Sequence, residues 1–175
     1  MAAKSATTSA GATVNLEKSA IDDLRSRLRG ILLSAGDAGY EDARSVWNAM
    51  IDRRPALIAR CLGGADIVAC VNFARDRGIA LSIKGGGHNI AGLAVCDGAL
   101  MIDLSLMRGV WVDRAARVAR AQGGCLLGDV DRETQVLRRT ILRAQRIGID
   151  REAGLKFKQF VLGERRLSRI ARSHA

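Results

Sequence analysis

The densest chemical signal in this sequence is a run of three glycines followed by a histidine. Residues 85–89 read Gly-Gly-Gly-His-Asn directly after an apolar segment, and Gly92 follows closely. Because glycine has no Cβ, such a turn can adopt positive φ angles and direct successive backbone N–H groups at one oxyanion. The segment lacks the Lys-Ser/Thr pair of a Walker loop and the G-x-G-x-x-G spacing of a Rossmann site. A phosphate-binding loop of another kind is therefore one interpretation, and a plain tight crossing between strands is the alternative that composition alone favours.

The histidine at the rim of this loop adds further chemistry. An imidazole in the place of His88 can act as a nucleophile, as a base or as a point of covalent attachment. A loop histidine that only makes hydrogen bonds is the structural alternative, and position alone favours it.

The four cysteines do not have the spacing of a metal site or a disulfide framework. They contain no C-x-x-C pair, and only two histidines could join them as ligands. They are Cys61, Cys70, Cys96 and Cys125. We therefore expect no metal, and reduced, mostly buried thiols in a cytoplasmic protein.

Hydrophobic patterning predicts an α+β body of one domain around the glycine loop. The expected strands are 55–61, 79–84 and 99–104, followed by a hairpin of 109–113 and 117–122. Three helices are expected. The first is capped by Asn15, and its stripe of apolar residues continues to Leu32. The second covers 65–77 with Ile67, Val71 and Ala74 on its buried face, and the third covers 126–135. A strand, helix, strand order predicts parallel pairing, so a small subdomain of this kind is expected beside a mixed sheet.

We expect no export signal at the start of the given sequence. Residues 1–14 are small and polar, which predicts a mobile tail, and the longest apolar stretch is interrupted by Asp97 and Asp103. Charged residues at those positions exclude a membrane span there.

Two longer sequence segments resemble those of a known protein family. Residues 83–113 and 119–135 resemble the PCMH-type FAD-binding domain of the vanillyl-alcohol oxidase superfamily, and within it the berberine-bridge-enzyme-like oxidases of bacterial type. The resemblance covers roughly residues 36–135. It implies the FAD-binding portion of an FAD-linked oxidoreductase of the oxidase type, in which a small-molecule substrate passes a hydride to the flavin.

The resemblance also implies roles for individual residues. In the family, the glycine loop wraps the FAD pyrophosphate with backbone amides, and a second glycine segment lines the adenosine and pyrophosphate side. The matching cofactor-binding residues are Lys84, Gly85, Gly86, Gly87, His88, Asn89, Gly92, Gln122, Gly123 and Gly124. Lys84 replaces the usual arginine, which keeps the positive charge and loses the planar fork. In many members the histidine is bonded to the flavin 8α-methyl carbon, which makes His88 the candidate covalent anchor. No catalytic residue is identified.

Residues 136–175 differ from the rest of the chain. They hold 11 of the 28 Lys and Arg residues and 3 of the 18 Asp and Glu residues, and the resemblance stops at Val136. We therefore expect residues 15–135 to form the amino-terminal part of the FAD-binding domain and 136–175 a divergent basic tail, in a chain that is truncated and inactive alone. Binding of nucleic acid or another polyanion through the tail is the alternative function, and a solvated end or an altered reading frame would also explain the break. FAD is favoured over nucleic acid as the partner.

Overall fold

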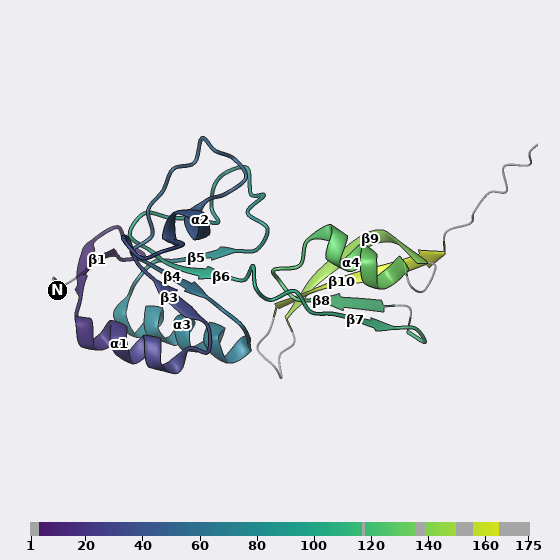
Figure 1. The fold of residues 1–175 in the computed structure, drawn as a ribbon, viewed down its shortest axis with the longest axis horizontal. Helices are drawn as coiled ribbons and strands as arrows, with labels where there is room; N and C mark the ends of the chain where they lie inside the picture. The colour runs from purple at the N-terminus through teal and green to yellow at the C-terminus, as the bar shows by residue number, and fades with distance from the viewer. Residues whose placement is uncertain (1–3, 117, 136–138, 150–155, 165–175) are drawn as a thin grey trace, which may run out of the picture.

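The computed structural model describes residues 4–116, 118–135, 139–149 and 156–164, with side chains described up to residue 135. The described strands form three sheets, one of two strands and two of four. Figure 1 shows a larger part with the helices α1–α3 and a second part that contains α4. The α+β class expected from the sequence is therefore confirmed.

The sheet of the larger part has the strand order β3-β4-β6-β5. Its strands are β3 (Ile31–Leu33), β4 (Leu57–Arg60), β5 (Leu81–Lys84) and β6 (Leu100–Asp103). β6 pairs in parallel with β4 and β5, and β3 pairs antiparallel with β4. The predicted strands are confirmed, but the two strands that flank the helix do not pair directly because β6 lies between them.

Helices cover this sheet on both faces (Figure 1). On one face α1 (Lys18–Arg27) and α3 (Gly64–Arg77) share a core with residues of β4 and β6 that include Leu57 and Ile102. On the other face α2 (Tyr40–Arg44) packs with Ile58 and Met101. Central parallel strands that are covered on both faces are apolar throughout, which explains the continuous apolar runs in β4 and β6.

The predicted buried face of α3 is wrong in part. Asp66, Cys70, Phe73 and Ala74 are the buried residues of this helix, whereas Val71 is 40% exposed. The helix is therefore rotated so that the larger Phe73 side chain fills the core, and it ends as predicted at Gly78 with a φ of +64°.

The predicted mobile tail is also wrong for the described part of residues 1–14. Strands β1 (Lys4–Thr7) and β2 (Thr13–Leu16) form an antiparallel hairpin, and Ala6 is buried in the main core. Its backbone is tied down because the Thr7 N–H donates to the Gly98 carbonyl at 2.8 Å. Asn15 therefore lies in β2 and caps no helix, and the predicted stripe is divided between β2, α1 and β3.

The second part contains the predicted hairpin of β7 (Val110–Asp113) and β8 (Val118–Ala121). Helix α4 (Leu127–Gln135) packs its buried Val130 against Ala119 and Ala121 of β8. Strand β10 (Lys156–Glu164) pairs with β8 and with β9 (Arg139–Ile149). Two stretches of the predicted basic tail are thus strands, and residues 136–138, 150–155 and 165–175 lie outside the described residues.

No helix within the described ranges combines the length and the apolar character that crossing a bilayer requires.

The carboxylate of Asp66 connects the start of α3 to the start of β3. It is fully buried and accepts hydrogen bonds from the backbone N–H groups of Arg29 (2.9 Å), Gly30 (3.2 Å) and Leu62 (2.8 Å). One buried carboxylate therefore satisfies three backbone amide donors from two separate segments.

The side chain of Lys84, at the end of β5, connects this strand to α2. It is 8% exposed, and its Nζ donates to the carbonyl oxygens of Ala43 and Ser45, the second at 3.1 Å. Burial lowers the pKa of the Lys84 ammonium below its ordinary value, and the negative charge of Asp103 opposes this shift only in part.

We predict that Asp66→Ala lowers the free energy of unfolding by about 3 kcal/mol, because it removes three hydrogen bonds from backbone N–H groups to a charged carboxylate. Asp76→Ala in the same helix is the control, since Asp76 makes an exposed ion pair with Arg75. The control should cost less than about 0.5 kcal/mol. Urea titrations followed by circular dichroism measure both values, and equal costs would contradict the role of Asp66.

We predict that Lys84 makes the stability of the protein depend on alkaline pH. The folded state releases the Lys84 proton at a lower pH than the unfolded chain does, because its pKa is lowered. Between the two pKa values the unfolded chain holds more protons, so the free energy of unfolding rises with pH there. Below the lowered pKa, Lys84 is charged in both states, and burial of this charge lowers the free energy of unfolding by its full amount.

The variant Lys84→Met should lack this rise. Urea titrations from about pH 7 to about pH 10 should therefore show the stability difference moving in favour of the wild type as the pH increases. A difference that stays constant over this range would contradict the lowered pKa of Lys84.

Candidate cofactor site

The two glycine segments predicted from the sequence come together in the structure. Segment 85–89 follows β5, and segment 122–124 follows β8. A Cβ added to Gly85 would lie only 2.5 Å from the carbonyl oxygen of Gly123, a distance that no real side chain tolerates. Backbone therefore meets backbone at this point, which requires glycine at position 85.

The second segment is fixed by an even closer approach. A Cβ at Gly124 would lie 1.7 Å from the Leu104 carbonyl oxygen, and the Gly124 N–H donates to the Met107 carbonyl at 3.2 Å. The side-chain Oε1 of Gln122 accepts from the Gly109 N–H at 2.7 Å. These contacts hold the segment against the loop that follows β6, and they show that the polar group of Gln122 is used within the protein.

The amide groups of the first segment are available to a ligand. Among the described residues, none of the backbone N–H groups from Gly85 to Asn89 donates a hydrogen bond to a protein acceptor. Gly87 is buried and has a φ of +72°. Gly86, His88 and Asn89 are exposed, so a ligand can reach this run of N–H groups from solvent. A run of N–H donors without a protein acceptor, around a left-handed glycine, fits an oxyanion. The residues present therefore fit the phosphate groups of a dinucleotide.

Asn89 and Gly92 shape the return of the loop. The Asn89 Oδ1 accepts from the Leu93 N–H at 2.9 Å, and the Asn89 carbonyl accepts from the Gly92 N–H at 3.1 Å. Gly92 has a φ of +71°, and a Cβ there would lie 2.8 Å from Ile51 Cγ2. These two residues therefore close a turn and bring it against the segment that follows α2.

Lys84 differs from its predicted role. The sequence places its positive charge near a diphosphate, but its ammonium is buried against the Ala43 and Ser45 carbonyl oxygens. In the structure this lysine fixes the strand from which the glycine loop starts.

His88 lies exposed at the rim, and its ring contacts Trp47. The two ring centroids are 5.8 Å apart, and the ring planes are inclined by 28°. The part of the chain that the structure describes shows no hydrogen bond to the His88 ring. Stacking on Trp47 is thus the interaction that the described residues show for the His88 ring.

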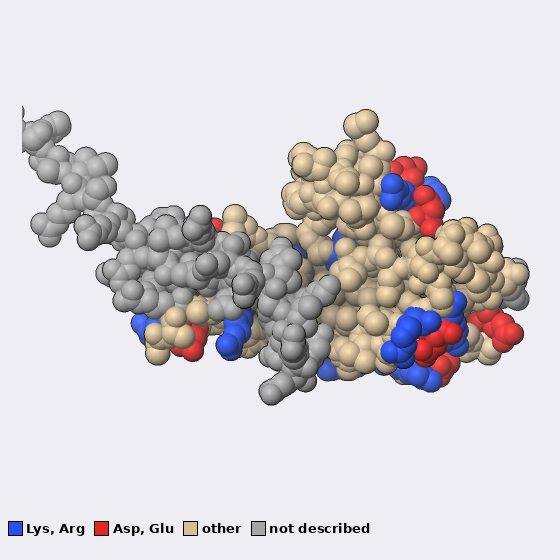
Figure 2. Space-filling model, turned by 180° about the vertical axis from the view of Figure 1, so that it is seen from behind, with Lys and Arg blue, Asp and Glu red and all other residues tan. Residues whose placement is uncertain are grey.

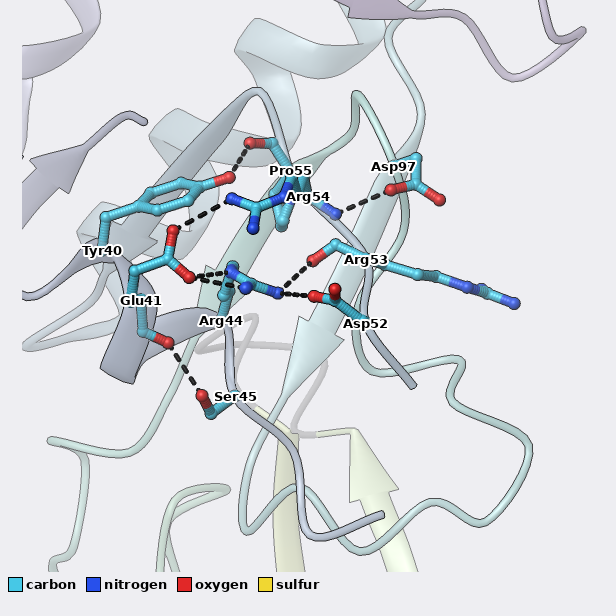
Figure 3. A network of polar contacts seen from close by, with 9 residues as sticks. All are labelled: Tyr40, Glu41, Arg44, Ser45, Asp52, Arg53, Arg54, Pro55 and Asp97. Atoms are coloured by element: carbon cyan, nitrogen blue, oxygen red, sulfur yellow. Dashed lines mark hydrogen bonds and ion pairs between the residues drawn. The ribbon is translucent and has the colours of Figure 1, made fainter. Parts of the chain in front are cut away.

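An ion-pair network holds the segment that carries Trp47 (Figure 3). Arg44, at the end of α2, pairs with Glu41 of the same helix and with Asp52, and it donates to the Arg53 carbonyl at 3.3 Å. Hydrogen bonds from Arg44 lower the pKa values of the Glu41 and Asp52 carboxyl groups. Both ends of segment 45–53 are thereby joined to one guanidinium group.

The same network reaches the loop that follows His88. The Arg54 N–H donates to Asp97 Oδ1 at 2.7 Å, and the Arg54 guanidinium pairs with Glu41 at 3.0 Å (Figure 3). No sequence motif indicates this arrangement, and the predicted site residues do not include Trp47. Its only signal was its rarity, since the chain has two tryptophans.

Comparison with known proteins agrees with this geometry. The FAD binding domain family matches residues 55–142, a range that contains both glycine segments. The chain is 37% identical over 106 residues to (R)-6-hydroxynicotine oxidase from Paenarthrobacter nicotinovorans, a match that covers 61% of this chain and 23% of that protein.

Solved structures of oxidases and related proteins also resemble this chain. The crystal structure of 6-hydroxy-D-nicotine oxidase from Arthrobacter nicotinovorans superposes with a TM-score of 0.63 and 33% identity, covering 67% of this chain and 26% of that one. A berberine-bridge-enzyme-like protein of Physcomitrella patens shares the fold, with a TM-score of 0.63 and 22% identity over 69% of this chain and 27% of that one. The chain thus spans about a quarter of the length of these relatives. Because the family match includes half of the chain and both glycine segments, the protein belongs to the FAD binding domain family.

Proposed function

We propose that this chain supplies the FAD-binding part of an FAD-linked oxidoreductase of the oxidase type that acts on a small-molecule substrate. The observation that carries the proposal is the contact between the two glycine segments beside five backbone amides that have no protein acceptor. The relatives named as oxidases support the reaction type. FAD, when bound, accepts a hydride from a substrate and passes two electrons to dioxygen.

The predicted site residues divide into two groups by the use of their polar groups. The amides of residues 85–89 would bind the pyrophosphate, and Gly123 would lie beside them. Lys84, Asn89 and Gln122 would act by holding the loops, because their side chains already have partners within the protein. Gly92 and Gly124 would allow the close approaches that these loops require.

We further propose His88 as a covalent anchor for the flavin. A ring nitrogen of His88 would form a bond to the flavin 8α carbon. One hydrogen of the 8α methyl group and the imidazole N–H hydrogen would be lost as protons, and the two electrons would pass through the flavin to dioxygen, which would leave as hydrogen peroxide. The exposed imidazole at the end of the amide run supports this proposal.

The alternative function, polyanion binding through residues 136–175, depends on side chains outside the described ones and stays a prediction. On the described part of the face in Figure 2, Lys and Arg lie beside Asp and Glu. In α1, for example, Lys18 and Arg25 pair with Asp22, and Arg27 pairs with Asp23. Such paired charges give no support to a polyanion site in that region.

We predict that Gly85→Ala weakens FAD binding by at least about tenfold, because the new Cβ must displace the Gly123 carbonyl. Gly128→Ala is the control, since a Cβ at Gly128 meets nothing within 4 Å. Titration of each purified protein with FAD, followed by flavin fluorescence, gives the dissociation constants. Equal affinity of the wild type and Gly85→Ala would count against the proposed site.

We predict that His88→Ala abolishes acid-stable flavin and keeps reversible FAD binding, because the backbone amides remain. The wild-type protein should give a yellow pellet after acid precipitation, and the pellet of the variant should be colourless. A yellow variant pellet, or a colourless wild-type pellet from protein saturated with FAD, would refute the covalent anchor without affecting reversible binding.

A further inference from the structure

We propose that Trp47 is a positioning residue that holds the His88 imidazole in one orientation. The consequence for flavin attachment rests on the proposed function, whereas the contact itself is a property of this chain.

Both the side chain and the backbone of Trp47 contact the glycine loop. Its indole stacks on the imidazole with ring centroids 5.8 Å apart, within the range of favourable aromatic pairs. Its backbone N–H donates to the Gly87 carbonyl at 3.1 Å. A Cβ added at Gly87 would lie 3.5 Å from the Cα of Val46, so the two segments lie no more than about one methyl group apart at this point.

The stack is not explained by burial of the indole. Trp47 is 72% exposed, although tryptophan is among the side chains that gain most from burial. Its most specific contact is therefore the His88 ring. An exposed histidine on a loop would otherwise rotate among several side-chain conformations, and a stack of this kind favours one of them by about two- to tenfold.

The segment that carries Trp47 is fixed independently of the stack. Arg44 joins Glu41 before the segment to Asp52 near its end (Figure 3). Asn48 Nδ2 donates to the Ile90 carbonyl at 3.5 Å, and Ile51 packs against Gly92. The backbone that carries the Trp47 indole is thus held in place, and the indole can orient the His88 ring.

The direct test uses proton–carbon NMR spectra of the histidine rings in the 175-residue chain without FAD. The chain has two histidines, so His88→Ala assigns the His88 signals. In the wild type, the indole should shift the ring protons of His88 upfield. Trp47→Leu, which keeps an apolar side chain and removes the aromatic ring, should abolish this shift, and Trp47→Phe should restore it in part. Met50→Ala is the control, because Met50 is an 89% exposed apolar residue of the same segment.

The second test measures the rate at which acid-stable flavin forms with saturating FAD. Trp47→Leu should slow this rate by about two- to tenfold with an unchanged dissociation constant for FAD, and Trp47→Phe should recover it. A structural role alone would change the affinity and the rate together.

Two results would overturn the proposal: His88 signals that are the same in wild type and Trp47→Leu, or an unchanged rate in that variant. If the wild type forms no acid-stable flavin, the covalent anchor fails, and the spectra alone decide whether Trp47 orients the ring.

Discussion

The structure depends on the close approach of backbone segments that only glycine permits. At Gly85 the chain passes so near the Gly123 carbonyl that a methyl group does not fit, and at Gly124 it does the same against Leu104. These contacts join the loop after β5, the loop after β6 and the segment after β8. They bring residues distant in sequence to one place and leave the amides of residues 85–89 directed at no protein acceptor.

Charged side chains hold the elements next to these loops in position. Lys84 fixes the end of β5 to the end of α2, and Arg44 joins α2 to the far end of the following segment. In both cases a cation is used for internal connection and is not offered to a ligand. The binding potential of the site therefore comes from backbone dipoles, which need no ionisable group and are insensitive to pH.

Much of the fold could be predicted because its signals are local. The apolar runs of β4 and β6, the stop of α3 at Gly78 and the hairpin of β7 and β8 each depend on neighbouring residues in the sequence. The glycine loop is predictable for the same reason, because its residues are consecutive in the sequence.

The remaining features depend on contacts between distant segments. The amino-terminal hairpin has a weak local signal because it consists mainly of small residues. It is held by Ala6 in the core and by the hydrogen bond from the Thr7 N–H to the Gly98 carbonyl. The face of α3 is set by how Phe73 fits the sheet, and periodicity alone placed Val71 there. The use of Lys84 and the contact between Trp47 and His88 also follow only from three-dimensional proximity.

The central claim is that the backbone amides of residues 85–89 bind the paired phosphates of FAD. Nitrogen-15 NMR of the labelled chain, titrated with FAD, ADP and adenosine, tests this claim most directly. The account predicts that the amide signals of Gly85, Gly86, Gly87, His88 and Asn89 shift and saturate with FAD and ADP, and that adenosine leaves them in place. Saturable FAD binding that leaves these five signals unmoved would contradict it.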